Sequence, residues 1–239
     1  MATPWDAHAY DVSSTPQQAW ASEVMARLDG IPPDATVLDV GCGTGRVTES
    51  LLALVPHGRV LAIDASEEMV ALARTRLGGR AQVWRQDVLD LGLPEPVDVI
   101  VSAAALHWVT DHDRMWGRLA RALRPGGILE VQCGGAGNIG RVREVIEMVA
   151  RDAFPELAGW SPWVFASLED RPTYPEGVGA FVRTSILAAH LARLSPQRRE
   201  QFAAAVVAGV RLPLDFVRLN VSAIRYWAIR EPRARGDVR

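Results

Sequence analysis

The 239-residue sequence contains no lysine, so all 26 of its basic residues are arginine. The Gly-Lys-Ser/Thr motif of a P-loop therefore occurs nowhere in the chain, which excludes that class of nucleotide site. The only cysteines, Cys42 and Cys133, are too few for a disulfide-stapled domain, and we interpret both as reduced thiols of a cytoplasmic protein. A formal net charge of -2 provides no basic field, so we expect no nucleic-acid partner.

Long apolar stretches are also missing. No run approaches the ~20 residues of a membrane span, and residues 1–6 show no basic region followed by an apolar one. We therefore expect neither a membrane partner nor a secretory signal. The apolar fraction of 49% is nevertheless enough for a substantial core, and the length suits one domain with a small cap.

A glycine-rich turn stands between a strand pattern and a helix pattern. The apolar run Thr36–Val40 leads into Gly41-Cys42-Gly43-Thr44-Gly45, and apolar residues at helical spacing follow. Glycines at alternate positions remove side chains where a ligand would touch the backbone, and the turn aims the free N–H groups of a helix at that ligand. A dinucleotide fold usually has G-x-G-x-x-G, but Arg46 stands where the last glycine would be, which disfavours a dehydrogenase.

An acid ends the next expected strand, Arg59–Ile63. Asp64 follows Gly45 by 19 residues and is placed to accept hydrogen bonds from both hydroxyls of a ribose. The alternative is a helix cap, although Ser66 can cap the following helix without it. The third expected strand, Gln82–Arg85, is followed by Asp87, which is either a ligand-binding acid or a loop cap, with Asp90 as a competing acid.

Strands and helices continue to alternate. Strand Val97–Val101 precedes small residues and then His107 and Trp108, and helix Asp111–Leu123 ends at an Arg-Pro-Gly-Gly break before strand Ile128–Cys133. Five such alternations predict an α/β fold with a mostly parallel sheet covered by helices on both faces.

The expected organisation has five parts. Helices over about 139–154, 175–194 and 195–210 enclose a proline-broken aromatic stretch, and Leu212–Ile224 reads as the last strand. We expect an N-terminal lid and helix at 1–30, a cofactor-binding core at 31–135, a helical cap and substrate region at 136–211, the closing strand at 212–226 and a disordered tail at 227–239. The aromatic residues of the first segment either close over the cofactor or simply pin a loose terminus.

Together these positions resemble the class I S-adenosylmethionine-dependent methyltransferases over about residues 30–224. The resemblance implies a Rossmann-like, doubly wound, mostly parallel seven-stranded sheet with helices on both faces and a small helical and aromatic cap over the substrate side. The resemblance implies a cofactor, S-adenosylmethionine, with S-adenosylhomocysteine as product, and an acid after the third strand that reads the adenine amino group beside a backbone N–H. The implied cofactor-binding residues are Tyr10, Asp39, Gly41, Cys42, Gly43, Gly45, Asp64, Ala65, Met69, Asp87, Val88, Ser102 and Ala103. Ser102–Ala105 is not the Asn/Asp-Pro-Pro-aromatic run typical of nucleobase amino methylases, and no Asp/Asn cluster suggests a metal site.

Within that class, the runs at 105–109, 137–139 and 143–145 resemble the trans-aconitate methyltransferase group. Two features depart from that group: Gln17 and Gln18 stand where an early basic residue is common, and the stretch 160–175 is short. The implied substrate residues are His107, Trp108, Arg143, Trp163, Phe165 and Tyr174. His107 is the catalytic candidate, either as a base or as a positioning group.

The expected activity is methyl transfer to a small molecule, with a carboxylate oxygen of a small organic acid favoured because a carboxylate needs no base. The alternatives are O- or N-methylation of a natural product or of a carrier-bound acid, and a non-catalytic protein that only binds S-adenosylmethionine. We expect a monomer or a homodimer.

Overall fold

The sheet places the ends of five parallel strands at one edge of the molecule. The computed structural model describes residues 22–28, 30–165, 173–174, 187–209, 214–215 and 218–224. Within this part, six strands form the main sheet in the order β3-β2-β1-β4-β5-β8, and β8 alone is antiparallel. The strands are β1 (Thr36–Val40), β2 (Arg59–Asp64), β3 (Gln82–Arg85), β4 (Val97–Ala103), β5 (Leu123–Gly134) and β8 (Arg218–Ile224). The strand order reverses between β1 and β4, where ligands of open α/β sheets bind.

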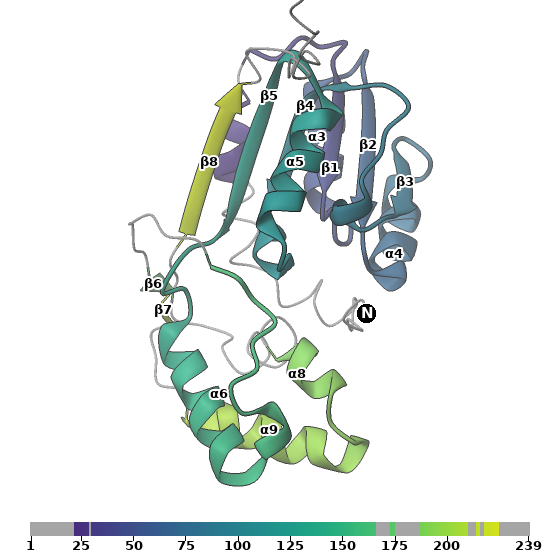
Figure 1. The fold of residues 1–239 in the computed structure, drawn as a ribbon. Helices are drawn as coiled ribbons and strands as arrows, with labels where there is room; N and C mark the ends of the chain where they lie inside the picture. Colours follow the sequence, from purple (N-terminus) through teal and green to yellow (C-terminus); the bar gives the residue numbers. More distant parts are fainter. Residues whose placement is uncertain are drawn as a thin grey trace, which may run out of the picture.

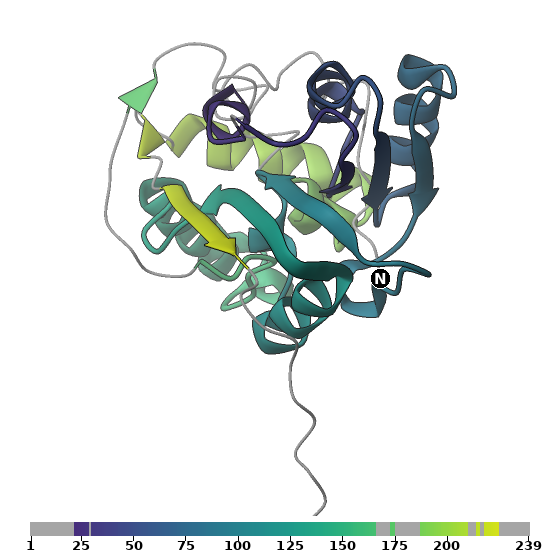
Figure 2. The same ribbon diagram turned by 90° about the horizontal axis from the view of Figure 1, so that it is seen from above.

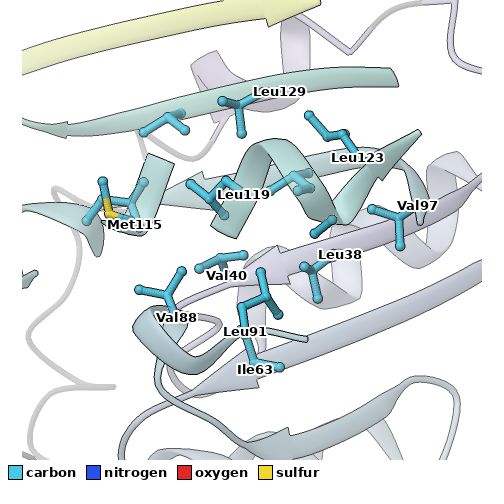
Figure 3. Packing of buried hydrophobic residues seen from close by; sticks show 14 of the residues in the cluster. Leu38, Val40, Ile63, Val88, Leu91, Val97, Met115, Leu119, Leu123 and Leu129 are labelled. Carbon is cyan, nitrogen blue, oxygen red and sulfur yellow. The ribbon is translucent and has the colours of Figure 1, made fainter. Parts of the chain in front are cut away.

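Helices cover both faces of this sheet. Helix α5 (His112–Ala122) and the short turns η1 (Val88–Asp90) and η2 (Leu106–Trp108) pack on one face. The apolar side chains between them and the strands, such as Leu38, Met115 and Leu119, form one continuous core layer (Figure 3). A helical segment at 22–26 and helices α3 (Arg46–Leu54) and α4 (Glu67–Leu77) bury the other face.

A second group of helices lies beyond the carboxyl ends of the parallel strands (Figure 1). It consists of α6 (Gly140–Ala153), η3 (Pro155–Leu157), α8 (Ala188–Ala192) and α9 (Pro196–Gly209), which share their own apolar cluster. Arg198 of α9 donates to the carbonyl of Ala153 and lies over the Phe154 ring, so it ties α9 to the last turn of α6. Strands β6 (Thr173–Tyr174) and β7 (Leu214–Asp215) form a separate antiparallel pair, and β8 lies along β5 at the sheet edge (Figure 2).

Three strand predictions are wrong. The described residues give six strands in the main sheet rather than seven, and the single closing strand 212–224 is divided between β7 and β8. The fifth strand begins at Leu123 rather than Ile128, because Leu123 pairs with Val97 and the register then shifts through the Arg-Pro-Gly-Gly residues. A positive φ of 80° at Gly126 absorbs the extra residues, and an ion pair between Arg124 and Asp98 holds this irregular start beside β4.

The remaining core elements agree closely with expectation. Helix α5 starts one residue after the predicted position because Asp111 caps it, its Oδ1 accepting from the N–H of Arg114 at 3.0 Å. In the described part of the chain, no helix is both long and apolar enough to cross a bilayer. Most of the predicted lid, with Tyr10, and the predicted tail 227–239 lie outside the described residues, as does most of the helix expected at 175–194.

Candidate active site

The glycine-rich turn after β1 meets the loop after β4 at the reversal of strand order. A side chain at Gly41 would overlap the Cβ of Ala105, so these two loops touch with no room between them. Gly45 also serves internal packing, since a Cβ there would lie 3.2 Å from Ala73 of α4. Only Gly43 would place a Cβ in open space, at a φ of 54°. Internal packing thus excludes a side chain at Gly41 and Gly45, whereas Gly43 faces open space, and the contact of all three glycines with a ligand stays a prediction.

The backbone N–H groups of this turn are mostly used within the protein. Those of Gly41 and Cys42 donate to the carbonyl of Ile63 at 2.8 and 3.0 Å, and that of Gly45 donates to the carbonyl of Cys42 at 3.0 Å. The N–H of Gly43 donates to Asp64 Oδ2 at 2.9 Å. A phosphate cradle needs such groups free. The turn therefore suits a ligand that approaches Gly43 by van der Waals contact rather than a pyrophosphate. The N–H groups expected to face the ligand are those of the first turn of α3, and that expectation stays a prediction.

Asp64 bridges the ends of two loops. Its Oδ1 accepts from the N–H of Ser66 at 2.9 Å while its Oδ2 accepts from Gly43, and burial raises the pKa of this carboxyl against the effect of these hydrogen bonds. Ser66 caps α4, since its Oγ accepts from the N–H of Met69 at 3.3 Å. Asp64 is therefore not needed as the helix cap. The N–H of Ala65 also acts on this carboxylate, which leaves at least one of its four acceptor positions for a hydroxyl donor.

Several other predicted cofactor residues lie behind the surface. Asp39 is 1% exposed and accepts from Thr48 Oγ1 at 2.7 Å, and burial raises its pKa to about 7. Ser102 is fully buried and donates from Oγ to the carbonyl of Val40 at 2.7 Å. Cys42 and Met69 are buried as well, and burial raises the pKa of the Cys42 thiol. In this structure Asp39 fixes the start of α3 and Ser102 joins the ends of β1 and β4.

The turn after β3 presents Asp87 to solvent. Asp87 Oδ1 accepts from the N–H of Leu89 at 2.9 Å, so the carboxylate caps η1 while remaining exposed. The neighbouring side chain of Val88 is buried under α5. The competing acid, Asp90, pairs instead with Arg114 at 2.6 Å. Between the two acids, the structure leaves Asp87 available to a ligand.

His107 is oriented by a backbone donor from β5. The N–H of Gly134 donates to His107 Nδ1 at 3.2 Å. Because a backbone N–H can only donate, Nδ1 carries the lone pair and Nε2 of the neutral ring carries the proton. Burial lowers the pKa of His107 to about 4. The ring is therefore neutral at physiological pH and presents a hydrogen-bond donor at Nε2.

An aromatic wall, which we define as Trp108, Trp163 and Phe165, surrounds this histidine. Phe165 stacks on His107 with ring centroids 5.7 Å apart, and Trp163 lies 6.0 Å from Phe165 and 5.5 Å from Trp108. The guanidinium of Arg143, at the start of α6, lies 5.5 Å from the Phe165 centroid. Five of the six predicted substrate residues are thus brought together. Tyr174 lies in β6, and its side chain is outside the described part of the structure.

Backbone contacts that the sequence did not indicate hold this wall in place. The N–H of Val164 donates to the carbonyl of His107 at 3.0 Å, which joins the aromatic segment to η2. Ala104 adopts a φ of 57° and donates its N–H to the carbonyl of Gln132 at 2.7 Å. A non-glycine residue in that conformation is strained, and such strain gathers at functional sites. The one feature of the sequence that could have indicated these contacts is Gly134, a glycine at the end of a predicted strand.

Comparisons with known proteins find methyltransferases among the similar sequences. Residues 37–127 match a family model described as a methyltransferase domain. A trans-aconitate 2-methyltransferase from Methylobacterium nodulans is 40% identical over 128 residues, which are 54% of this chain and 49% of that enzyme. A malonyl-[acyl-carrier protein] O-methyltransferase from Bacillus anthracis is 35% identical over 125 residues, 51% of this chain and 46% of that enzyme. The resemblance to the S-adenosylmethionine-dependent methyltransferases is confirmed over this part of the chain.

The fold extends further than the sequence match. The crystal structure of the YcgJ protein from Bacillus subtilis is similar with a TM-score of 0.57 at 18% identity, covering 87% of this chain and 99% of that one. At that identity the similarity concerns the fold alone. The chain spans about half the length of the curated relatives it matches.

Proposed function

We propose that this protein is an S-adenosylmethionine-dependent methyltransferase that methylates a carboxylate oxygen of a small organic acid resembling trans-aconitate. The observation that supports a carboxylate as the methyl acceptor is the hydrogen-bonding state of the His107 ring. Its Nδ1 is occupied by the N–H of Gly134, so the group that faces an acceptor is the Nε2 donor. A neutral donor suits an acceptor that is already an anion, and it cannot take a proton from a hydroxyl.

The residues around the glycine-rich turn fit the proposed cofactor. The open space at Gly43 admits a ligand against the backbone, Asp64 retains acceptor capacity for a ribose hydroxyl, and Asp87 is exposed for the adenine amino group. Met69, Asp39 and Ser102 support this surface from behind. When bound, S-adenosylmethionine supplies an already activated methyl group, so the protein has mainly to align the acceptor and exclude water.

His107 and Arg143 are the proposed acceptor-binding groups. Arg143 is exposed, and within the described part of the chain no carboxylate pairs with it. Its guanidinium lies 5.5 Å from the Phe165 ring centroid and the His107 ring lies 5.7 Å from it, so both groups are near enough to donate to an acid held beside Phe165. The aromatic wall and α6, with α8 and α9 behind them, form the proposed cap that keeps water from the reacting oxygen. Proper alignment alone supplies about 7–11 kcal/mol.

A carrier-bound acid is the second candidate acceptor. The Bacillus anthracis relative named above is a methyltransferase of malonyl-[acyl-carrier protein], and such a substrate also offers a carboxylate. The net charge of -2 does not favour docking of an acidic carrier, which supports the free acid.

A labelled-cofactor assay distinguishes these acceptors. Purified protein is incubated with methyl-labelled S-adenosylmethionine and a panel of free di- and tricarboxylic acids, phenols and a malonyl carrier protein, and products are identified by mass spectrometry. We expect a methyl ester of a free acid and no methylated phenol. Transfer only to phenols would overturn the carboxylate proposal, and transfer only to the carrier would favour the second acceptor. Arg143→Gln should raise KM for acids with a second carboxylate, with Arg121→Gln as a control on the exposed part of α5.

A further inference from the structure

The adenine-side turn η1 has little stability of its own. It is a single three-residue turn, and one turn of helix fixes several dihedral angles for very few hydrogen bonds. Its internal bonds are the Asp87 side-chain cap and two backbone bonds, from the N–H of Asp90 to the carbonyl of Asp87 at 3.0 Å and from the N–H of Leu91 to the carbonyl of Val88 at 3.1 Å. A binding site that reads a base edge needs this turn to be held more firmly than that.

Helix α5 supplies the missing support through arginines one helical turn apart. Arg118 donates from Nε to the carbonyl of Leu89 at 3.1 Å, and its Nη1 lies 3.5 Å from the carbonyl of Leu91. Arg114 pairs with the Asp90 side chain at 2.6 Å, but this contact is largely exposed. Arg118 is half-buried and binds the backbone itself. It is therefore the stronger constraint on the path of the turn.

Apolar packing fixes the same turn from beneath. Val88 and Leu91 lie under α5 in the layer that also holds Met115 and Leu119 (Figure 3). This packing sets the distance of η1 from α5, whereas the two bonds from Arg118 fix its rotation and its carbonyl directions. The exposed carboxylate of Asp87 and the N–H of Val88 are carried by this constrained backbone.

We propose that Arg118 is a positioning residue that sets the selectivity of the cofactor site for adenine without touching the cofactor. The inference rests on the proposed function, in which Asp87 accepts from the adenine amino group. Losing the Arg118 bonds lets η1 shift, so a bond that depends on the Asp87 direction weakens while contacts at Gly43 and Asp64 remain. The effect is therefore a loss of discrimination between bases, which a general loss of stability does not produce.

Calorimetry with two ligands tests this. S-adenosylhomocysteine carries the 6-amino group, and S-inosylhomocysteine carries an oxo group that faces the Asp87 carboxylate unfavourably. The wild type should prefer the first by at least about tenfold, the effect of one hydrogen bond to a charged group. Arg118→Met should weaken binding of S-adenosylhomocysteine about tenfold and leave S-inosylhomocysteine nearly unchanged. Arg118→Lys should lose part of the preference, and Arg121→Met, a matched change on the same helix, should keep it.

A double-mutant cycle completes the test. If Arg118 acts through Asp87, then Asp87→Ala with Arg118→Met should show no smaller preference than Asp87→Ala alone. The inference is wrong if Asp87→Ala abolishes the preference while every Arg118 variant that folds keeps it, a result that leaves the proposed function intact. If the wild type binds neither ligand, the proposed function fails and the inference with it. Thermal melting of each variant identifies those that fold. If Arg118→Met does not fold, Arg118→Lys, which retains the positive charge, serves as the test variant.

Discussion

Replacing His107 by glutamine tests whether this residue donates a hydrogen bond or removes a proton. A glutamine amide can accept from the N–H of Gly134 with its oxygen and donate into the site with its nitrogen, but it cannot act as a base. We therefore expect His107→Gln to keep kcat within about tenfold of the wild type, since a general base contributes about 10²–10⁴-fold.

Leucine is the matched control at this position. His107→Leu removes the donor and leaves the Gly134 N–H without its acceptor, a loss of about 1–3 kcal/mol. The corresponding fall in kcat/KM is about 5- to 150-fold at 1.36 kcal/mol per factor of ten. Recovery of most of this loss by glutamine would identify the hydrogen bonds, rather than ring volume or basicity, as the contribution of His107.

The pH dependence of kcat gives a second test of whether His107 acts as a base. Burial lowers the pKa of His107 to about 4, so the ring stays neutral and its Nε2–H donor persists from about pH 5.5 to 9, above that titration. The acceptor carboxylate is also ionised over this range. We expect kcat of the wild type and of His107→Gln to show no limb near pH ~6.5, where an unperturbed histidine titrates. A wild-type limb there, absent in a glutamine variant that is a hundredfold or more slower, would refute the carboxylate mechanism and indicate a hydroxyl acceptor.

Three further predictions concern the cofactor surface and the helical region. Asp64→Ala should weaken S-adenosylmethionine binding by about 1–3 kcal/mol in calorimetry, because ribose hydroxyls lose their acceptor. Gly43→Val should abolish measurable binding by filling the open space at the turn. His190 is 1% exposed, both of its nitrogens lack partners in the described part of the chain, and burial lowers its pKa to about 4, with Arg193 acting in the same direction. In the unfolded state His190 is therefore protonated below pH ~6.5, whereas in the folded state it is protonated only below about pH 4. This difference lowers the free energy of unfolding by about 2 kcal/mol at pH 5. His190→Phe should abolish that loss in urea titrations at pH 7.5 and 5.

Each of these predictions has a control. Glu67→Ala removes an exposed acid at the start of α4, and binding reduced equally by it and by Asp64→Ala would remove Asp64 from the site. Gly78 has a φ of 56°, close to that of Gly43, and also faces open space, so Gly78→Val reproduces the backbone strain away from the turn. Normal binding by Gly43→Val would contradict the assignment of that surface. For His190, an unchanged stability gap between variant and wild type at the two pH values would show that the histidine does not titrate as described.

The sequence pattern predicted those parts of the fold that depend on local chemistry. Thr36–Val40 is a strand at the predicted residues, and the Ser66 cap and the Asp111 start of α5 follow from short-range side-chain bonds. The early start of β5 could not be predicted, because Arg-Pro-Gly-Gly reads as a break. It becomes part of a strand only through its pairing with β4, which is a contact across the sheet.

The sequence predicted which residues lie at the candidate site better than it predicted what each of them does there. Gly41, Gly43 and Gly45 look equivalent in the sequence, and only contacts with Ala105 and Ala73 distinguish the packed positions from the open one. The donor character of His107 depends on an N–H 27 residues away. Such roles arise from tertiary contacts, so no local spacing encodes them.

The contact between Gly41 and Ala105 limits how this protein can diverge. Because a methyl group at position 41 would occupy the place of the methyl group at 105, neither residue can grow unless the other shrinks or its loop withdraws. A withdrawn loop would carry His107 with it. A larger side chain at this contact would therefore alter both the proposed cofactor site at the glycine-rich turn and the proposed acceptor site at His107. Descendants with new acceptors are therefore expected to keep this pair and to diversify in the aromatic wall and α6, where changes leave the glycine turn undisturbed.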